Sequence, residues 1–201
     1  MEKYQNKYRI KTNRLQNWDY GWNGAYFVTI CTKNREHYFG NIYDDKIKFT
    51  NIGKLAEKYW SEIPKHFPFV KSDVFVVMPN HIHGIIIIDK FDDKYNGRRN
   101  VETPKLGVST DVKTKLKIGR KNPKWKPNIL GTIINQYKRI CTINARKINP
   151  DFAWQPRFYD HIIRNEESFN NISKYIINNP QNWNNDELYN QINNKTNTQN
   201  P

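Results

Sequence analysis

The sequence is poor in cysteine, in acidic residues and in long apolar runs. Its two cysteines, Cys31 and Cys141, have neither the spacing of a zinc site nor a disulfide framework, so we expect the reducing conditions of a cytoplasm. No apolar run approaches the roughly 20 residues of a spanning helix, and the first residues lack the apolar core of a signal peptide, so we expect no membrane association. Asp and Glu number 19 against 33 Lys and Arg, and the net charge of +14 favours nucleic acid as the partner.

The chain, at 201 residues, is long enough for one domain with a sizeable core. A polar, basic stretch over residues 1–24 is interpreted as an N-terminal arm, and residues 25–183 as the folded domain. Within that domain, residues 90–127 combine lysine and arginine with glycine and proline, which predicts a basic insertion loop. Residues 184–201 are rich in asparagine and nearly free of large apolar side chains, so we expect a flexible tail without a role.

Runs of β-branched and aromatic residues predict the strands of the domain, with a small hairpin around Asp44 and Asp45. The predicted strands cover residues 25–32, 69–77, 81–88 and 158–163.

Apolar residues at helical spacing predict three helices. They cover residues 52–63, residues 128–148 and residues 166–178. We expect Pro64 to end the first helix and Ile148 to face inward at the end of the second. The order strand, helix, strand, strand, helix, strand, helix predicts an α+β fold: a ferredoxin-like antiparallel sheet with helices on one face and an added C-terminal helix.

Two histidines stand at the start of an apolar strand, in Met-Pro-Asn-His-Ile-His at residues 78–83. Alternate side chains of a strand share a face, so His81 and His83 point the same way. Two imidazoles held on one rigid strand can bind a divalent metal. The alternative is that His81 caps the turn and His83 sits in a half-buried sheet.

The last predicted helix carries Tyr175 and Asn179, which lie one turn apart on the same side. If this helix crosses the sheet near the histidines, Tyr175 presents its phenol oxygen to the metal and Asn179 offers a carbonyl oxygen as a third ligand. The set then suits phosphoryl transfer, with Mg²⁺ or Mn²⁺ polarising a phosphate oxygen and tyrosine as the nucleophile. The alternative is an amphipathic helix with a surface tyrosine.

Three motifs in this order resemble the REP-associated tyrosine transposases, which belong with the single-tyrosine, HUH-type transposases of small insertion sequences. The motifs are Met-Pro-Asn-His-Ile-His at 78–83, Trp-Gln-Pro-Arg-Phe-Tyr-Asp-His-Ile-Ile-Arg-Asn at 154–165, and Tyr-Ile-Ile-Asn-Asn-Pro at 175–180. The resemblance implies a ferredoxin-like catalytic domain with a divalent metal held by His81 and His83, with Asn179 as third ligand. It also implies Tyr175 as the nucleophile and single-stranded DNA with hairpin or palindromic elements as the substrate.

DNA contacts are expected from basic residues in the insertion, on the outward face of the second long helix and around the last strand. These residues are Arg98, Arg99, Lys138, Arg139, Arg146, Lys147, Arg157 and Arg164. For each of them the alternative is an ordinary solvated surface charge.

The sequence therefore predicts a metal-dependent single-stranded DNA endonuclease and strand transferase, acting through a 5′ phosphotyrosine as a monomer or a homodimer. A non-catalytic nucleic-acid-binding protein is the first alternative. A replication or conjugation initiator is the second, and such proteins commonly carry helicase or partner-binding segments that do not occur here.

Overall fold

The computed structural model describes residues 3–4, 7–8, 15, 18–90 and 129–189. The predicted insertion lies outside the described residues from residue 91 onward, and so do Arg98 and Arg99. Much of the predicted N-terminal arm and the tail beyond Tyr189 also lie outside them. Within the arm, β1 (Lys3–Tyr4) and β2 (Lys7–Tyr8) form a short antiparallel pair.

A four-stranded antiparallel sheet forms the centre of the molecule, in the order β6-β7-β3-β8. The strands are β3 (Gly24–Cys31), β6 (Val70–Val77), β7 (His81–Ile88) and β8 (Tyr159–Ile163). Strand β7 pairs with β3 on one side and with β6 on the other, so hydrogen bonds fix its backbone from both sides. The strand order and the intervening helices confirm the predicted α+β, ferredoxin-like fold.

The first helix, α1 (Asn51–Ser61), begins at Thr50, whose side chain accepts a hydrogen bond from the Gly53 backbone N–H at 3.0 Å. The prediction that Pro64 ends this helix is wrong. The helix stops at Ser61, and Pro64 lies in the first turn of a short second helix, α2 (Ile63–His66). Proline is tolerated there because first-turn N–H groups have no partner within the helix.

The third helix, α3 (Leu130–Ala145), and the last, α4 (Glu166–Asn178), cover the two faces of the sheet. The prediction that Ile148 faces inward is wrong: α3 ends at Ala145, the helical spacing stops with it, and Ile148 is half exposed. The Asn165 side chain caps α4, accepting from the Ser168 N–H at 2.8 Å.

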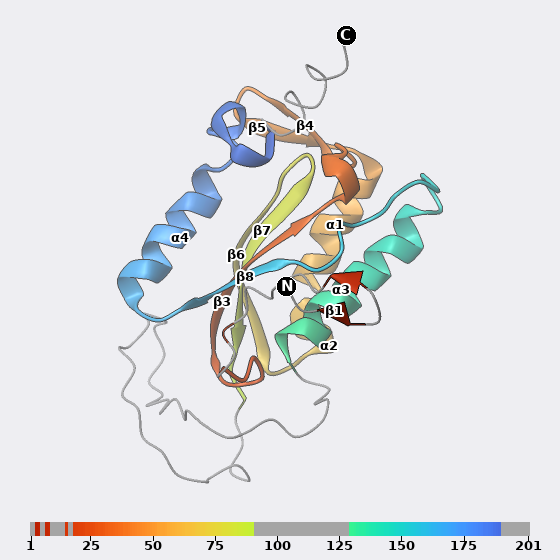
Figure 1. Ribbon diagram of the computed structural model, residues 1–201. Helices are drawn as coiled ribbons and strands as arrows, with labels where there is room; N and C mark the ends of the chain where they lie inside the picture. The colour runs from red at the N-terminus through yellow and green to blue at the C-terminus, as the bar shows by residue number, and fades with distance from the viewer. Residues whose placement is uncertain (1–2, 5–6, 9–14, 16–17, 91–128, 190–201) are drawn as a thin grey trace, which may run out of the picture.

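The two faces of the sheet carry cores of unequal size. The larger core lies between the sheet and helices α1 and α3, and contains Trp60, Tyr137 and the even-numbered residues of β3 and β7. The smaller core lies under α4 and consists of Ala25, Ile85, Ile163 and Ile176 with their half-buried neighbours. Figure 1 shows α4 on one side of the sheet, with α1 and α3 on the other. Because the smaller core does not extend along the whole of its face, part of the sheet remains uncovered beside α4.

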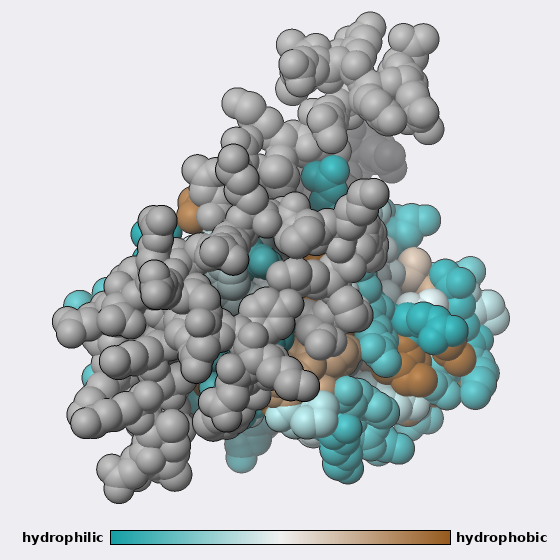
Figure 2. Space-filling view, turned by 90° about the horizontal axis from the view of Figure 1, so that it is seen from below, coloured by the Kyte–Doolittle hydropathy of each residue, from teal (hydrophilic) through white to brown (hydrophobic). Residues whose placement is uncertain are grey.

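A separate hairpin of β4 (Gly40–Tyr43) and β5 (Lys46–Phe49) turns at Asp44 and Asp45 as predicted; both residues have positive φ angles. In the view from below, hydrophilic side chains cover most of the described surface (Figure 2). Among the described residues, no helix has the length and apolar character needed to cross a membrane.

Candidate functional site

The two histidines of β7 project from the face of the sheet that α4 covers. Both side chains are buried, and their ring centroids lie 4.4 Å apart. Cys31 and Thr29 of β3 stand opposite His81 and His83 in the strand register. The separation of the two imidazoles is therefore set by a strand that is hydrogen-bonded on both sides.

Neighbouring side chains orient both rings. The Asn80 amide oxygen lies 2.7 Å from His81 Nδ1, and an amide oxygen can only accept, so Nδ1 carries the proton of the neutral ring. Thr29 Oγ1 lies 2.8 Å from His83 Nδ1. The Nε2 atom of His81 is buried without a hydrogen-bond partner among the described residues. A buried nitrogen lone pair of this kind is suited to bind a cation.

The two imidazoles are neutral at ordinary pH. Burial lowers the pKa of His83 to about 3, and the nearby positive charge of Arg35 contributes to that shift. Burial also holds the pKa of His81 well below its usual value, with further lowering by His83 and Arg35. Neutral rings are the form that ligates metals, so no proton competes for these nitrogens.

Helix α4 brings Tyr175 to the histidines across more than 90 residues of sequence. Its hydroxyl lies 3.2 Å from His83 Nε2, and its ring is edge-on to the His83 ring with centroids 5.2 Å apart. Phe27 of β3 stacks on His83 at 5.4 Å and meets Tyr175 at 6.1 Å, which supports both rings from the sheet. Burial and the Asp186 carboxylate raise the pKa of Tyr175 above its ordinary value, while a hydrogen bond to Asn179 opposes the shift.

Asn179 is buried at the C-cap of α4, one turn after the tyrosine. Its Oδ1 is buried and has no hydrogen-bond partner among the described residues, and its Nδ2 donates to Asp186 at 3.3 Å. The structure thus places Asn179 beside the histidines, where its free oxygen adds a further donor atom to the group.

Asp186 is the site residue that sequence reasoning missed. One ligand atom each from His81, His83 and Asp186 lie within 4.8 Å of one another. The structure describes residues 184–189, which belong to the stretch expected as a flexible tail, and it brings Asp186 to the two histidines. A sequence signal did exist, because Asp186 and Glu187 interrupt the asparagine-rich run with charge.

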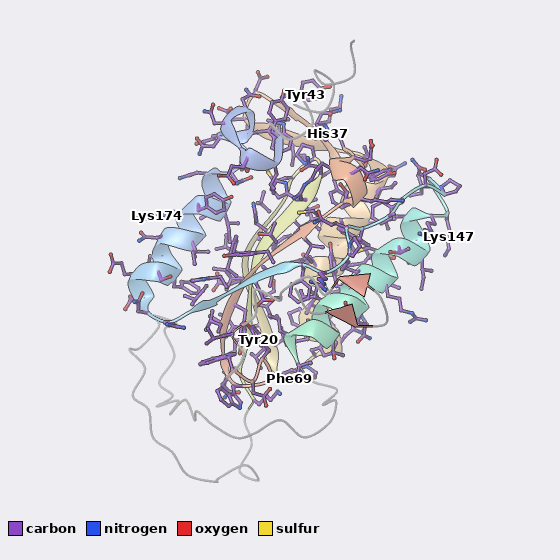
Figure 3. All side chains as sticks on the ribbon, viewed as in Figure 1. Tyr20, His37, Tyr43, Phe69, Lys147 and Lys174 are labelled. Atoms are coloured by element: carbon purple, nitrogen blue, oxygen red, sulfur yellow. The ribbon has the colours of Figure 1, made fainter. Side chains whose placement is uncertain are left out.

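A short C-terminal segment, residues 183–189, carries Asp186 to the site. It begins with a 3₁₀ turn, η3 (Trp183–Asn185), and Trp183 packs against His81 at 5.9 Å and against His37 at 5.6 Å. Asn80 also holds this segment, because its Nδ2 donates to the Leu188 carbonyl at 3.2 Å. Figure 3 labels His37 near this end of the sheet.

The donor set fits a divalent cation. Two imidazole nitrogens and one carboxylate oxygen lie within 4.8 Å of one another, and Asn179, whose Oδ1 is unpaired among the described residues, donates from Nδ2 to the same carboxylate. A mixture of nitrogen and oxygen ligands of this kind suits Mn²⁺ and related ions, and oxygen-rich sets suit Mg²⁺.

A groove of about 1740 Å³ opens beside the histidines. The uncovered strands β3 and β8 contribute Phe27, Thr29 and Tyr159, while Tyr175 and Asp186 stand on the α4 side. This volume exceeds the ~300–1,000 Å³ of ordinary small-ligand pockets, so the groove can receive a polymer.

The basic residues expected to contact DNA fall into separate places. Arg157 lines the groove and Arg164 is exposed just after β8, whereas α3 carries its cations on the opposite side of the sheet. Figure 3 shows Lys147, just after α3, and Lys174, on α4, far apart on the two sides. Lys138 and Arg139 lie on α3, and Arg146 is its C-cap residue.

Two of these basic side chains form hydrogen bonds with backbone carbonyls of the chain. The Lys138 ammonium donates to the Gln155 and Arg157 carbonyls at 2.8 and 2.9 Å, and Arg146 Nε donates to the Phe152 carbonyl at 3.0 Å. Both side chains therefore stabilise the segment that leads into β8.

Comparison with known proteins gives two curated relatives, both from Haemophilus influenzae. An uncharacterized protein is 38% identical over 181 residues, which cover 88% of this chain and 91% of that protein. A protein named as a candidate REP-associated tyrosine transposase is 25% identical over 162 residues, covering 81% of this chain and 73% of that protein. No protein-family model matches the chain.

A solved structure of a REP-associated tyrosine transposase bound to a REP hairpin shares the fold. It aligns with a TM-score of 0.52 at 17% identity, covering 87% of this chain and 74% of that one. The chain therefore has the fold of a tyrosine transposase, and its sequence is similar to that of a protein named as a candidate REP-associated tyrosine transposase.

Proposed function

We propose that this protein is a metal-dependent endonuclease and strand transferase for single-stranded DNA, with Tyr175 as its nucleophile. The observation that carries the proposal is the 3.2 Å separation between the Tyr175 hydroxyl and His83 Nε2. That contact joins the nucleophile to the ligand group of His81, His83 and Asp186 in one chain, so each molecule holds a complete set.

The reaction is a phosphoryl transfer in which the atoms balance. The Tyr175 oxygen attacks the phosphorus of a phosphodiester and forms a new O–P bond, while the bond from phosphorus to the 3′ oxygen breaks. The phenol loses its proton to solvent, and the leaving 3′ oxygen takes up one proton to become a 3′ hydroxyl. The protein then holds the 5′ phosphate as a phosphotyrosine, and attack by another 3′ hydroxyl reverses the step and joins two strands.

His81, His83 and Asp186 would hold the divalent cation, with Asn179 Oδ1 beside them as a further donor. When bound, Mg²⁺ or Mn²⁺ supplies charge that polarises a non-bridging phosphate oxygen. Asn80 and Thr29 keep the imidazoles oriented, and Phe27 supports the tyrosine ring from the sheet. The chain therefore fixes the nucleophile before the substrate binds. The entropy cost of ordering the nucleophile is then no longer part of the activation free energy.

Substrate and setting follow from the same features. The groove beside Tyr175 is open and partly aromatic, as expected for an unpaired strand, and the solved transposase with the same fold was bound to a REP hairpin. We assign hairpin or palindromic DNA as the substrate. A single protein chain would act on this DNA with its own tyrosine. The described cysteines are both free, in keeping with action in a cytoplasm.

The test uses end-labelled single-stranded oligonucleotides that contain a hairpin, incubated with the full chain and Mn²⁺. We expect a denaturant-resistant protein–DNA adduct that Tyr175→Phe abolishes and chelation of the metal prevents. Tyr43→Phe is the matched control, because Tyr43 is exposed on the β4–β5 hairpin and does not line the groove. DNA binding with no adduct from the unaltered protein would instead support a non-catalytic DNA-binding protein.

A further inference from the structure

Arg35 lies at the edge of the groove and has no role in the chemistry described so far. It stands in a 3₁₀ turn, η1 (Lys33–Arg35), directly after β3, and lines the groove with His83, Tyr175 and Asp186. Its Nη1 atom is buried and has no hydrogen-bond partner among the described residues, and these residues offer it no ion pair within 4.0 Å. A buried guanidinium nitrogen without an acceptor is costly unless a ligand supplies one.

The backbone that carries Arg35 is held in an unfavourable conformation. Asn34 and Arg35 have φ angles of 55° and 62°, in the left-handed region that a bulky side chain rarely adopts. Such residues persist where the surroundings hold them and gather at functional sites.

Hydrogen bonds hold this turn to the histidine strand. The Thr32 backbone N–H donates to the Asn80 carbonyl at 2.9 Å, and Thr32 Oγ1 lies 2.9 Å from the same oxygen. Asn80 directly precedes His81, so the turn that aims Arg35 and the strand that aims the imidazoles move as one unit.

The charge of Arg35 reaches the site. It contributes to the lowered pKa values of both His81 and His83, and it opposes the rise that burial causes in the pKa of Cys31 at the end of β3. Asp186 is the acidic member of the ligand group, and it already accepts from Asn179 and from the Leu188 N–H. With a divalent cation present, the site would carry more positive than negative charge, which an incoming phosphodiester would balance.

Resting on the function proposed above, we infer that Arg35 is a catalytic residue that donates hydrogen bonds from its guanidinium to a non-bridging oxygen of the scissile phosphodiester. Charge on those oxygens must be stabilised in the transition state and again in the phosphotyrosine. The planar fork of arginine matches phosphate geometry, and its charge cannot be lost by deprotonation. Tyr175 then attacks a phosphate that Arg35 holds from the end of β3.

The first experiment measures single-turnover adduct formation by Arg35→Gln on the hairpin oligonucleotide. We expect a loss of about 10²–10³-fold in rate, the usual effect of removing one donor to a developing charge. Lys33→Gln is the matched control, since Lys33 is exposed in the same turn and the variant removes the same charge. The control should react within about threefold of the unaltered protein, as expected for one screened surface charge.

The second experiment separates contact with the phosphate from support of the fold. A methylphosphonate at the scissile position replaces one charged oxygen by a methyl group, and its two diastereomers address the two oxygens in turn. For the diastereomer that lacks the contacted oxygen, the difference between the unaltered protein and Arg35→Gln should shrink to less than about tenfold, because that contact is absent from both. An equally large difference on the phosphodiester and on both diastereomers would overturn the inference.

The two proposals fail in different ways. If the unaltered protein forms no adduct, the proposed function is wrong, whereas an adduct formed at equal rates with and without Arg35 overturns only the role of Arg35. Thermal unfolding checks that Arg35→Gln is folded at the assay temperature. If it is not, Arg35→Lys carries the test, since it keeps the charge and the methylene stem but lacks the fork, and it should react about tenfold more slowly.

Discussion

The two faces of the central sheet satisfy their polar atoms differently. On the face covered by α1 and α3, two large buried side chains have paired polar atoms: Trp60 Nε1 donates to Ser72 Oγ at 2.9 Å, and the Tyr137 hydroxyl donates to the Ala56 carbonyl at 3.0 Å. On the face beside α4, the His81 Nε2, Asn179 Oδ1 and Arg35 Nη1 atoms are buried without partners among the described residues. One face therefore supplies stability, and the other keeps unpaired atoms that a cation and a phosphate can satisfy.

Among variants that test this contrast, Trp60→Ala should have the largest effect, on the free energy of unfolding. Trp60 is fully buried in the larger core, stacked on Phe75 at 5.7 Å and edge-on to Tyr137 at 5.3 Å. Its truncation should lower the free energy of unfolding by about 3–5 kcal/mol, measured by urea denaturation. The fraction that remains folded should still form the adduct at a rate near that of the unaltered protein. A selective loss of adduct formation in folded Trp60→Ala would contradict the view that the α1 and α3 face supplies stability and the α4 face supplies the chemistry.

The next effect, on the other face, is expected from Asp186→Asn. Removing a charged ligand should weaken Mn²⁺ binding by at least about 100-fold, or ~2.7 kcal/mol, while the metal-free protein unfolds at nearly the same temperature. Titration of Mn²⁺ by calorimetry provides the measurement. Glu187→Gln removes the same charge from the adjacent, exposed residue and should leave the affinity within about threefold. Equal losses in the two variants would mean that general electrostatics, and no ligation by Asp186, sets the affinity.

Asn80→Ala should have a smaller effect on the same measurement. The Asn80 side chain orients His81 through Oδ1 and holds the Leu188 carbonyl through Nδ2. Loss of such a second partner typically costs about 10–100-fold in metal affinity. Asn80→Asp retains an acceptor for the imidazole and lacks the donor to Leu188, so its affinity compared with that of Asn80→Ala tells which bond matters more. An unchanged affinity in Asn80→Ala would contradict the orienting role.

Ser173→Ala should have the smallest effect. The Ser173 hydroxyl is buried on α4 and has no hydrogen-bond partner in the described part of the chain, yet it does not line the groove. Alanine removes the unpaired hydroxyl and is the better helix former, so stability should rise by no more than about 0.5 kcal/mol and adduct formation should not change. A clear loss of stability would reveal a partner for this hydroxyl and weaken the view that unpaired atoms on this face serve function.

Much of this arrangement could be predicted from the sequence because its signals are local. Alternation along β7 fixes a common face for the two histidines, and helical spacing brings Tyr175 and Asn179 together on α4. The resemblance of three motifs then supplied the pairing of these elements across the chain.

The missed parts have only weak local signals in the sequence. Asp186 stands in an asparagine-rich run whose composition predicts a tail, and only packing of Trp183 against the histidine strand gives it a place in the site. Arg35 depends on a left-handed turn that no common motif announces. The end of α3 was misplaced because Ile148 continues the apolar spacing beyond the helix.

Under the proposed function, the order of the site residues along the chain sets the moment during synthesis at which the candidate site becomes complete. During synthesis the imidazoles leave the ribosome early, the nucleophile follows almost a hundred residues later, and the carboxylate comes last, on the segment that Trp183 and Asn80 fasten to the sheet. A nascent or prematurely terminated chain that stops before Asp186 has the sheet and the tyrosine but lacks its acidic ligand. Synthesis through Asp186 therefore completes the candidate ligand group.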